Sequence, residues 1–535
     1  MKKILVLLVV LSMSIGCFAQ SEPRLIVGIV VDQMRADYLD RFRPLFGSEG
    51  FERLRREGAE FRYAHFNYVP TYTGPGHASV FTGAPPFEHG IIGNNWYDPF
   101  LKKQVYCVGD ERQTSVGCEG SSGMHSPHRM RSGSLGDALK LHTFGKSKVY
   151  GLSFKDRSAI LSAGHSADWA FWYDSESGDF VSSSYYQKAS LPKWLEQFNK
   201  ADRPRRMMRN SWNLLADRKA YAHLAPDQGP GERDVFQEGG VCFPHEFSSL
   251  SRSEKRSLIR WTPHGNTLLT DLAMELIENE FLGQDEFPDM LALSYSSPDH
   301  IGHAYGPNSW EVADQYARLD RDIARLLSFL DETIGAGQYT VFLTADHGVK
   351  PNGAVLSELN IPAGIVPSHE VAKTTKDFLQ EVYGDTALLE RVFDNHIHLK
   401  LDSFQLPLEP LIRALRSHLL ARHPNIKQIY TRMDLEGFSA VRGMGHLVLN
   451  GMNPLRTGDL VFELYPNYTT GGGHEVGTTH GSSLDYDTHV PLLFFGKGVP
   501  KMRSVEEVYI LDIAPTISNL MGMMEPDGCI GKPLF

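Results

Sequence analysis

The sequence predicts an α/β fold with a mostly parallel central sheet and helices on both faces. Two observations predict it. Short apolar runs, typical of strands buried on both faces of a parallel sheet, each end at a polar side chain. Amphipathic helices alternate with these runs along the chain. The 535 residues are 41% hydrophobic and 22% charged, which excludes a disordered chain, a coiled coil and a collagen-like repeat.

Five apolar runs are predicted as strands, at residues 25–31, 148–153, 290–294, 339–344 and 489–495. The predicted helices between them are 35–46, 266–281 and 311–334. Ligands of such sheets bind beyond the carboxyl ends of the strands. The polar residues that follow the strands are therefore the candidate site.

Two stretches, 168–262 and 350–475, fit the alternation of strands and helices badly. The first contains a hairpin-like aromatic segment at 169–186, and the second mixes helices with short strands. Length alone allows three or four domains of about 150 residues each. We instead expect one catalytic domain over residues 20–535, with these two stretches as insertions that form a cap over the sheet edge.

Residues 1–19 are predicted to be a secretory signal peptide. Lys2 and Lys3 precede the apolar run 4–11, and Cys17-Phe18-Ala19 is a cleavage signal before Gln20. The apolar run is far shorter than the roughly 20 residues of a membrane span. A lipid anchor on Cys17 is the less favoured alternative. We expect an exported protein, periplasmic or secreted, with no membrane span.

The charge balance and the cysteines limit the partners and the redox chemistry. The chain has 53 Lys and Arg against 64 Asp and Glu, a net charge of −11, which argues against a nucleic-acid-binding surface. An anionic substrate could still enter a basic pocket.

The four cysteines after the leader could form disulfides in an exported protein, and Cys107 with Cys118 is the local expectation. They are Cys107, Cys118, Cys242 and Cys529.

Three carboxylates and three imidazoles, the oxygen and nitrogen ligands that suit zinc, collect at the predicted strand ends and in one later loop. They are Asp32, Asp299, His303, Asp346, His347 and His480. Asp299 and His303 are four residues apart and share one face of a helical turn. Each residue alone has a structural explanation, because an Asp after a strand is usually a helix N-cap. Six such residues together indicate a metal site more specifically than any one of them does.

Thr73 precedes a Gly-Pro-Gly turn and a short apolar helix that is expected to stop at Gly83. Free backbone N–H groups at such a helix start form an anion site. The Thr73 hydroxyl could act as a nucleophile or only cap the helix. Asn94, in a Gly-flanked turn, could equally be structural.

The order of these motifs resembles the alkaline phosphatase superfamily, and within it the secreted bacterial PafA-type alkaline phosphatases, which use Thr as the nucleophile. The resemblance runs from Asp32 to the closing segment 512–534. The motifs that carry it are Asp32, Thr73-Gly74-Pro75-Gly76-His77, Gly93-Asn94-Asn95-Trp96, Lys155-x-Arg157, Asp299-x-x-x-His303, Asp346-His347-Gly348 and His480-Gly481.

The resemblance implies a two-zinc site. Asp299, His303 and His480 would hold one Zn²⁺, and Asp32, Asp346 and His347 would hold the other, with the Thr73 oxygen as its fourth ligand. Asn94, Lys155 and Arg157 would contact the phosphoryl oxygens. His480 is preferred to His474 on the resemblance alone.

The resulting hypothesis is an exported phosphomonoesterase that hydrolyses small phosphate monoesters through a phosphothreonine on Thr73. Two fixed cations, Lys155 and Arg157, favour a dianionic monoester over a diester. A phosphodiesterase or nucleotide pyrophosphatase of the same superfamily is the alternative. A sulfatase is disfavoured because His77 stands where that family has Arg, and a secreted binding scaffold is disfavoured because no ligand is missing.

Overall fold

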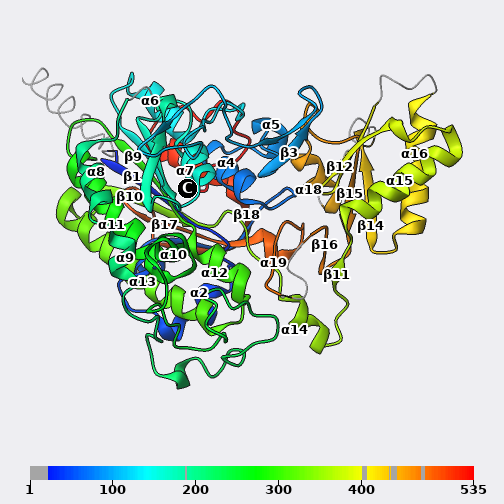
Figure 1. Cartoon of the computed structure of the whole chain (residues 1–535). Helices are drawn as coiled ribbons and strands as arrows, with labels where there is room; N and C mark the ends of the chain where they lie inside the picture. The colour runs from blue at the N-terminus through cyan, green and yellow to red at the C-terminus, as the bar shows by residue number, and fades with distance from the viewer. Residues whose placement is uncertain (1–21, 187–188, 401–406, 433, 435–442, 472–475) are drawn as a thin grey trace, which may run out of the picture.

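A ten-stranded sheet forms the centre of the molecule, as the computed structural model shows for residues 22–186, 189–400, 407–432, 434, 443–471 and 476–535 (Figure 1). Five adjacent strands, β10-β1-β9-β6-β7, run parallel. The strands, in spatial order, are β18 (Met502–Tyr509), β2 (Ala59–His65), β17 (His489–Gly496), β10 (Tyr339–Thr344), β1 (Leu25–Val31), β9 (Asp289–Tyr295), β6 (Val149–Ser153), β7 (Trp169–Asp174), β8 (Asp179–Ser183) and β5 (Ser115–Val116).

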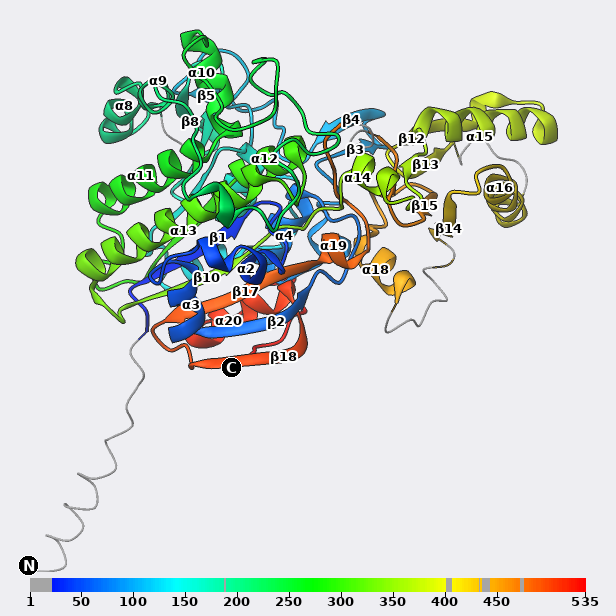
Figure 2. The same ribbon diagram turned by 90° about the horizontal axis from the view of Figure 1, so that it is seen from below.

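Helices cover both faces of this sheet (Figures 1 and 2). One layer consists of α2 (Tyr38–Arg41), α3 (Phe51–Glu57), α11 (Pro263–Glu280), α12 (Ser297–Tyr305) and α13 (Trp310–Leu330). The other consists of α4 (Thr73–Thr82), α6 (Leu135–His142), α7 (Asp156–Ala163) and α20 (Ile513–Leu520). Phe81 of α4 lies over Gly28 of β1, where a side chain on Gly28 would meet the ring. The predicted fold class is confirmed.

The predicted strands are confirmed, but the strand at 489–495, β17, pairs antiparallel with β10. The helix expected at 35–46 is wrong in its length. It consists of α2 and a 3₁₀ turn, η1 (Arg43–Leu45). Pro44 has no N–H to continue α-helical hydrogen bonding through this segment. The helix expected at 311–334 ends its α-helical part at Leu330 and closes with a π-helical turn, η5 (Asp331–Gly335).

The stretch 168–262 begins inside the central sheet, because β7 pairs parallel with β6 and β8 returns antiparallel beside β7. The expectation that this hairpin lies over the sheet edge is therefore wrong. Its aromatic residues explain the difference, since Trp169 and Phe171 are buried as core residues of a sheet strand. The remainder holds α8 (Lys193–Lys200), α9 (Arg203–Met207) and α10 (Arg252–Leu258).

Asp314 of α13 fastens the loop 212–221 of this stretch to the main body. Its carboxylate is fully buried and accepts hydrogen bonds from Trp212 Nε1 (2.7 Å), the Leu215 N–H (2.6 Å), Tyr221 OH (2.8 Å) and Arg318 Nε (2.7 Å). Trp212 and Tyr221 are also buried in the apolar core, so this acid pairs the polar atoms that their burial takes out of water.

The described residues between 364 and 469 build a separate lobe at one end of the molecule (Figure 1). Its antiparallel sheet has its own apolar core, which includes Val371, Ile397 and Leu415. The sheet contains β12 (Leu389–Phe393), β13 (His396–Leu399), β15 (Leu460–Leu464) and β14 (Ile426–Thr431), and α15 (Ser368–Tyr383) and α16 (Leu408–Arg422) pack on it. Smaller elements nearby are α5 (Pro86–His89), β3 (Asn95–Asp98), β4 (Lys103–Tyr106), α14 (Gly353–Glu358), β11 (Gly364–Ile365), α18 (Met444–Gly451), β16 (Tyr468–Thr469) and α19 (Asp485–Thr488).

The expected Cys107–Cys118 disulfide is wrong, because all four cysteines of the described residues are free thiols. Cys107 is buried beneath Gly74 at the start of α4, whereas Cys118 is half-buried next to β5. The predicted signal peptide lies outside the described residues. Among those residues, no helix combines the length and the apolar character needed to cross a membrane.

Replacing Asp314 with Ala is expected to lower the free energy of unfolding by about 3–5 kcal/mol, since it leaves Arg318 and two buried donors without their acceptor. Urea unfolding measures the loss. Asp377→Ala, at an exposed position of α15, is the control. Equal stability of the two variants would contradict the anchoring role of Asp314.

Candidate metal centre

The candidate site lies at the carboxyl ends of four neighbouring strands, in the order β10-β1-β9-β6. Asp346 and His347 follow β10, Asp32 follows β1, and Asp299 lies in the first turn of α12 after β9. Lys155 follows β6. The parallel pairing of these strands therefore brings together residues that are up to 315 positions apart.

Three carboxylates are buried side by side in this centre: Asp32, Asp299 and Asp346. Lys155 Nζ lies between two of them, 2.7 Å from Asp32 Oδ2 and 2.5 Å from Asp299 Oδ2. Burial raises the pKa of Asp32 to about 6, against the lowering effect of the Lys155 ammonium. Burial works against the ammonium of Lys155, but its two carboxylate partners hold its pKa above the usual value. The centre carries more buried negative charge than its own lysine neutralises.

The three imidazoles of the predicted set are oriented by backbone carbonyls. His303 Nδ1 donates to the Thr478 carbonyl (2.7 Å), His480 Nδ1 to the Thr71 carbonyl (2.8 Å) and His347 Nδ1 to the Gly348 carbonyl (2.9 Å). The Nε2 atoms of His347 and His480 are thereby left with their lone pairs, the arrangement in which histidine binds a metal. His303 Nε2 lies 3.1 Å from Asp299 Oδ1, and although burial disfavours the charged ring, this carboxylate raises the pKa of His303. Burial lowers the pKa of His480 to about 3 and that of His347 well below its usual value, so both rings are neutral.

Two groups of three side chains have ligand atoms close enough to share a metal ion. The ligand atoms of Asp299, His303 and His480 lie within 4.8 Å of one another, and so do those of Asp32, Asp299 and His347. The first group is the predicted one. In the second, Asp299 stands in place of Asp346. One Asp346 oxygen, Oδ1, accepts a hydrogen bond from the Gln33 N–H.

The second Asp346 oxygen still faces the centre. Asp346 Oδ2 lies 3.5 Å from His347 Nε2, which is itself 3.5 Å from Asp32 Oδ1. These three atoms are buried and have no hydrogen-bond partner among the described residues. Buried polar atoms are normally paired, so the orphaned atoms mark a place built for a cation. Their oxygen and nitrogen chemistry fits zinc.

Thr73 is the first residue of α4, and its side chain is 1% exposed. Its hydroxyl does not cap the helix; Arg157 Nη2 reaches Thr73 Oγ1 at 3.4 Å. Asn94 Oδ1 accepts a hydrogen bond from the Gly74 N–H (2.7 Å), which leaves the amide NH₂ of Asn94 available to donate. The expected stop at Gly83 is confirmed, with Gly83 in the left-handed region at φ 67°.

Two residues of the centre were missed by the sequence analysis as functional side chains. Gln33 Nε2 donates to Asp299 Oδ1 (2.6 Å), so Gln33 holds two of the carboxylates in place. His77 donates from Nδ1 to the Thr73 carbonyl (2.9 Å), and its Nε2 meets Ser294 Oγ (2.8 Å). Burial lowers the pKa of His77 to about 3, so it is a neutral positioning residue. The spacing of four between Thr73 and His77 was the signal that could have revealed it. His474 lies outside the described residues.

Comparisons with known proteins place the chain in a family. Residues 26–367 match the model of the type I phosphodiesterase / nucleotide pyrophosphatase family. The chain belongs to this family. Its resemblance to the PafA-type enzymes of the alkaline phosphatase superfamily is confirmed. The chain is 37% identical to the alkaline phosphatase PafA of Elizabethkingia meningoseptica, over 96% of this chain and 94% of that protein. It is 35% identical to the alkaline phosphatase PhoV of Synechococcus elongatus, over 96% and 92%.

Solved structures of PafA also match. The wild-type crystal structure superposes with a TM-score of 0.91 at 36% identity, covering 96% of this chain and 99% of that one. A PafA mutant substituted at a Thr, an Asn, a Lys and an Arg superposes with a TM-score of 0.90 at 35% identity, with the same coverage. The likeness therefore covers the sheet, both helical layers and the lobe.

Gly76→Ala is expected to displace Asp346, because the added Cβ would stand 2.3 Å from the Asp346 carbonyl oxygen and 2.7 Å from its Cβ. We expect a loss of about 1–3 kcal/mol in the free energy of unfolding and weaker zinc binding. Urea unfolding and calorimetric titration with zinc measure the two effects.

Gly240→Ala is the matched control, because nothing lies within 4 Å of the Cβ it would add. If Gly76→Ala binds zinc and unfolds like Gly240→Ala, the close approach of α4 to Asp346 is not needed.

Proposed function

We propose that the chain is an exported, zinc-dependent alkaline phosphatase that hydrolyses phosphate monoesters through a phosphothreonine on Thr73. The observation that carries this proposal is the convergence of the Thr73 hydroxyl, the Arg157 guanidinium and the two groups of metal ligands at one edge of the sheet. The enzyme class follows from the likeness to PafA and PhoV over nearly the whole chain. The substituted residue types of the PafA mutant, Thr, Asn, Lys and Arg, are those proposed here to contact phosphate.

The proposed metal ligands form two sets. Asp299, His303 and His480 would hold one Zn²⁺, and Asp32, Asp346 and His347 would hold the other. When bound, the two ions supply Lewis-acid stabilisation of the attacking and the leaving oxygen. The support is the orphaned ligand atoms and the three carbonyl-oriented imidazoles.

The chain itself would position the nucleophile. The His77 hydrogen bond to the Thr73 carbonyl holds the Thr73 backbone at the start of α4, and Arg157 Nη2 lies 3.4 Å from the Thr73 hydroxyl oxygen. Burial of α4 keeps bulk water from the backbone around it. The Thr73 oxygen, after losing its proton to solvent, would bond to phosphorus as the bond between phosphorus and the ester oxygen breaks, and the alcohol would leave with a proton taken from water. Water would then bond to phosphorus as the bond to Thr73 breaks, which releases inorganic phosphate and restores the Thr73 hydroxyl.

The phosphoryl group would be bound by three side chains from two segments, the turn at Asn94 and the start of α7. Arg157 offers two N–H groups of its planar fork and Asn94 its amide NH₂, both toward the oxygens of phosphate. Lys155 now contacts Asp32 and Asp299. We propose that its ammonium turns to a phosphoryl oxygen when cations neutralise those carboxylates. Two fixed positive charges favour the dianion of a monoester over the monoanion of a diester.

A phosphodiesterase remains the alternative within the same family, whose description names that activity. The comparison with PafA and PhoV does not favour it. We propose export on the basis of the predicted signal peptide, with cleavage after Ala19.

A direct comparison of p-nitrophenyl phosphate with bis-p-nitrophenyl phosphate tests the function. We expect a higher kcat/KM for the monoester, two zinc ions per chain by metal analysis, and loss of activity on chelation that zinc restores. Thr73→Ala should form no phosphoenzyme. A higher kcat/KM for the diester, activity without zinc, or normal turnover by Thr73→Ala would each refute its part of the proposal.

Arg157→Ala is expected to lower kcat/KM for the monoester by about 10²–10³, the cost of losing one donor to the charge of the transition state. The diester, which carries one negative charge fewer, should lose less. Arg413→Ala, on the exposed face of α16, is the control. Equal losses for the two substrates would show that Arg157 does not select monoesters.

A further inference from the structure

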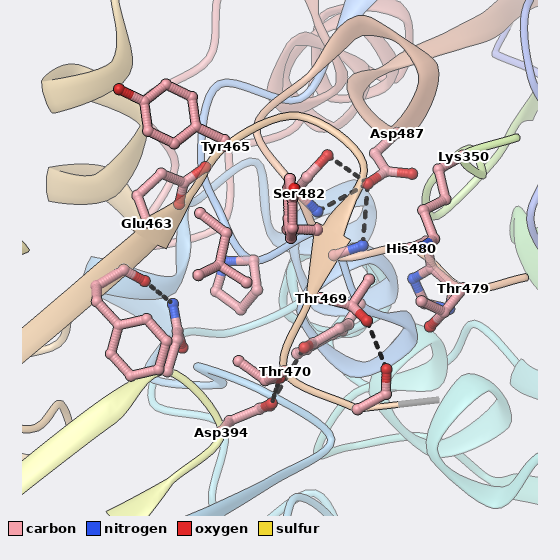
Figure 3. Close-up of a pocket in the computed structure, with 18 of the residues that line it drawn as sticks. Lys350, Asp394, Glu463, Tyr465, Thr469, Thr470, Thr479, His480, Ser482 and Asp487 are labelled. Atoms are coloured by element: carbon pink, nitrogen blue, oxygen red, sulfur yellow. Dashed lines mark hydrogen bonds between the residues drawn. The ribbon is translucent and has the colours of Figure 1, made fainter. Parts of the chain in front are cut away.

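A pocket of about 240 Å³ adjoins the metal centre and is not part of it (Figure 3). We call it the Lys350 pocket. It shares His480 with the centre and includes Tyr72, the neighbour of Thr73. One side is formed by Lys350 and by Asp487 of α19, and the opposite side by Glu463 of β15 and by Tyr465, which follows β15 (Figure 3).

Two buried groups in this pocket have unsatisfied polar atoms. Lys350 is 2% exposed and Asp487 1% exposed, and neither Lys350 Nζ nor Asp487 Oδ1 has a hydrogen-bond partner among the described residues. The other Asp487 oxygen, by contrast, accepts from the Gly481 N–H (3.1 Å), the Ser482 N–H (2.7 Å) and Ser482 Oγ (2.6 Å). An unpaired buried donor beside an unpaired buried acceptor is costly. A hydroxyl group, which both accepts and donates, would satisfy the two together.

The other walls narrow the class of ligand. Four tyrosines line the pocket: Tyr72, Tyr465, Tyr468 and Tyr486. Aromatic faces pack against the C–H surface of a ring. Two acids already have donors, since Asp394 accepts from Thr470 Oγ1 (2.9 Å) and Glu463 Oε1 from Ser483 Oγ (2.8 Å).

Charge and size add two further limits. Three acids, Asp394, Glu463 and Asp487, face one lysine, so an anionic group is disfavoured. The volume is below the roughly 300–1,000 Å³ of pockets for drug-sized ligands.

Resting on the proposed function, we propose that the Lys350 pocket binds the leaving group and selects phosphate esters of a neutral, hydroxylated alcohol of monosaccharide size. In an in-line displacement, the leaving oxygen lies opposite Thr73, on the side of Asp299, His303 and His480. His480 belongs to that set and also lines the pocket, so the pocket adjoins the centre on the side where the alcohol would leave. A hydroxyl of the alcohol accepts from Lys350 Nζ and donates to Asp487 Oδ1, and its ring lies against the tyrosines.

Two esters with the same CH₂–O–P connection test this inference: glucose 6-phosphate and cyclohexylmethyl phosphate, whose ring has no hydroxyls. The readout is the ratio of their kcat/KM values, and we expect about tenfold or more in favour of the glucose ester, the worth of hydrogen bonds to charged groups. Lys350→Met should lower this ratio about tenfold. Tyr465→Ala, whose side chain is half-exposed and so dispensable for folding, should lower it too.

Lys140→Met is the control. Lys140 lies on α6, forms an ion pair with Asp168 and does not line the pocket, so this variant should keep the wild-type ratio. A wild-type ratio near one, or variants that slow both esters equally, would overturn the pocket's role. If Lys350→Met does not fold, the ratio for Tyr465→Ala decides. An enzyme that hydrolyses neither ester nor p-nitrophenyl phosphate would instead refute the proposed phosphatase function.

Discussion

The burial of three carboxylates at one sheet edge is the constraint on which the centre depends. Asp32, Asp299 and Asp346 are at most 4% exposed, and charges of like sign cannot share such a space without compensation. The compensation comes from the Lys155 ammonium, the Gln33 side-chain amide and the Gln33 backbone N–H. The strand order β10-β1-β9-β6 places Lys155, which follows β6, beside the carboxylates that follow the other strands. A cation site is the arrangement that such an edge favours.

The three imidazoles at this edge of the sheet are oriented by backbone carbonyls. Their backbone acceptors, Thr71, Thr478 and Gly348, come from three segments far apart in sequence. His303 and His480 are therefore oriented only when distant segments fold against each other, whereas His347 bonds to the carbonyl of the next residue. Metal affinity and the packing of these loops are coupled, because a displaced carbonyl would free a ring to rotate.

Much of the fold could be predicted from the sequence, because a buried strand and the acid that follows it are recognisable from a few consecutive residues. Apolar runs such as 25–31 and 339–344 are long enough to reveal buried strands, and the acids that follow them stand out. Strand order is not local, so the side-by-side placement of Asp346, Asp32 and Asp299 was not readable from spacing. Gln33 was missed because only its backbone direction, at φ 67°, brings it to Asp346. The hairpin of β7 and β8 was misplaced because its aromatic pattern does not distinguish a strand of the central sheet from a strand of a cap.

The lobe has a core separate from that of the sheet, yet it supplies one wall of the Lys350 pocket. Glu463 at the end of β15 and Asp394 between β12 and β13 are fixed by the lobe's own packing. Changes in the lobe can therefore alter the wall without disturbing the strands that carry the metal ligands. The lobe side of the pocket and the metal centre are thus held by two separate apolar cores of one chain, so substitutions packed in one core need not change the other.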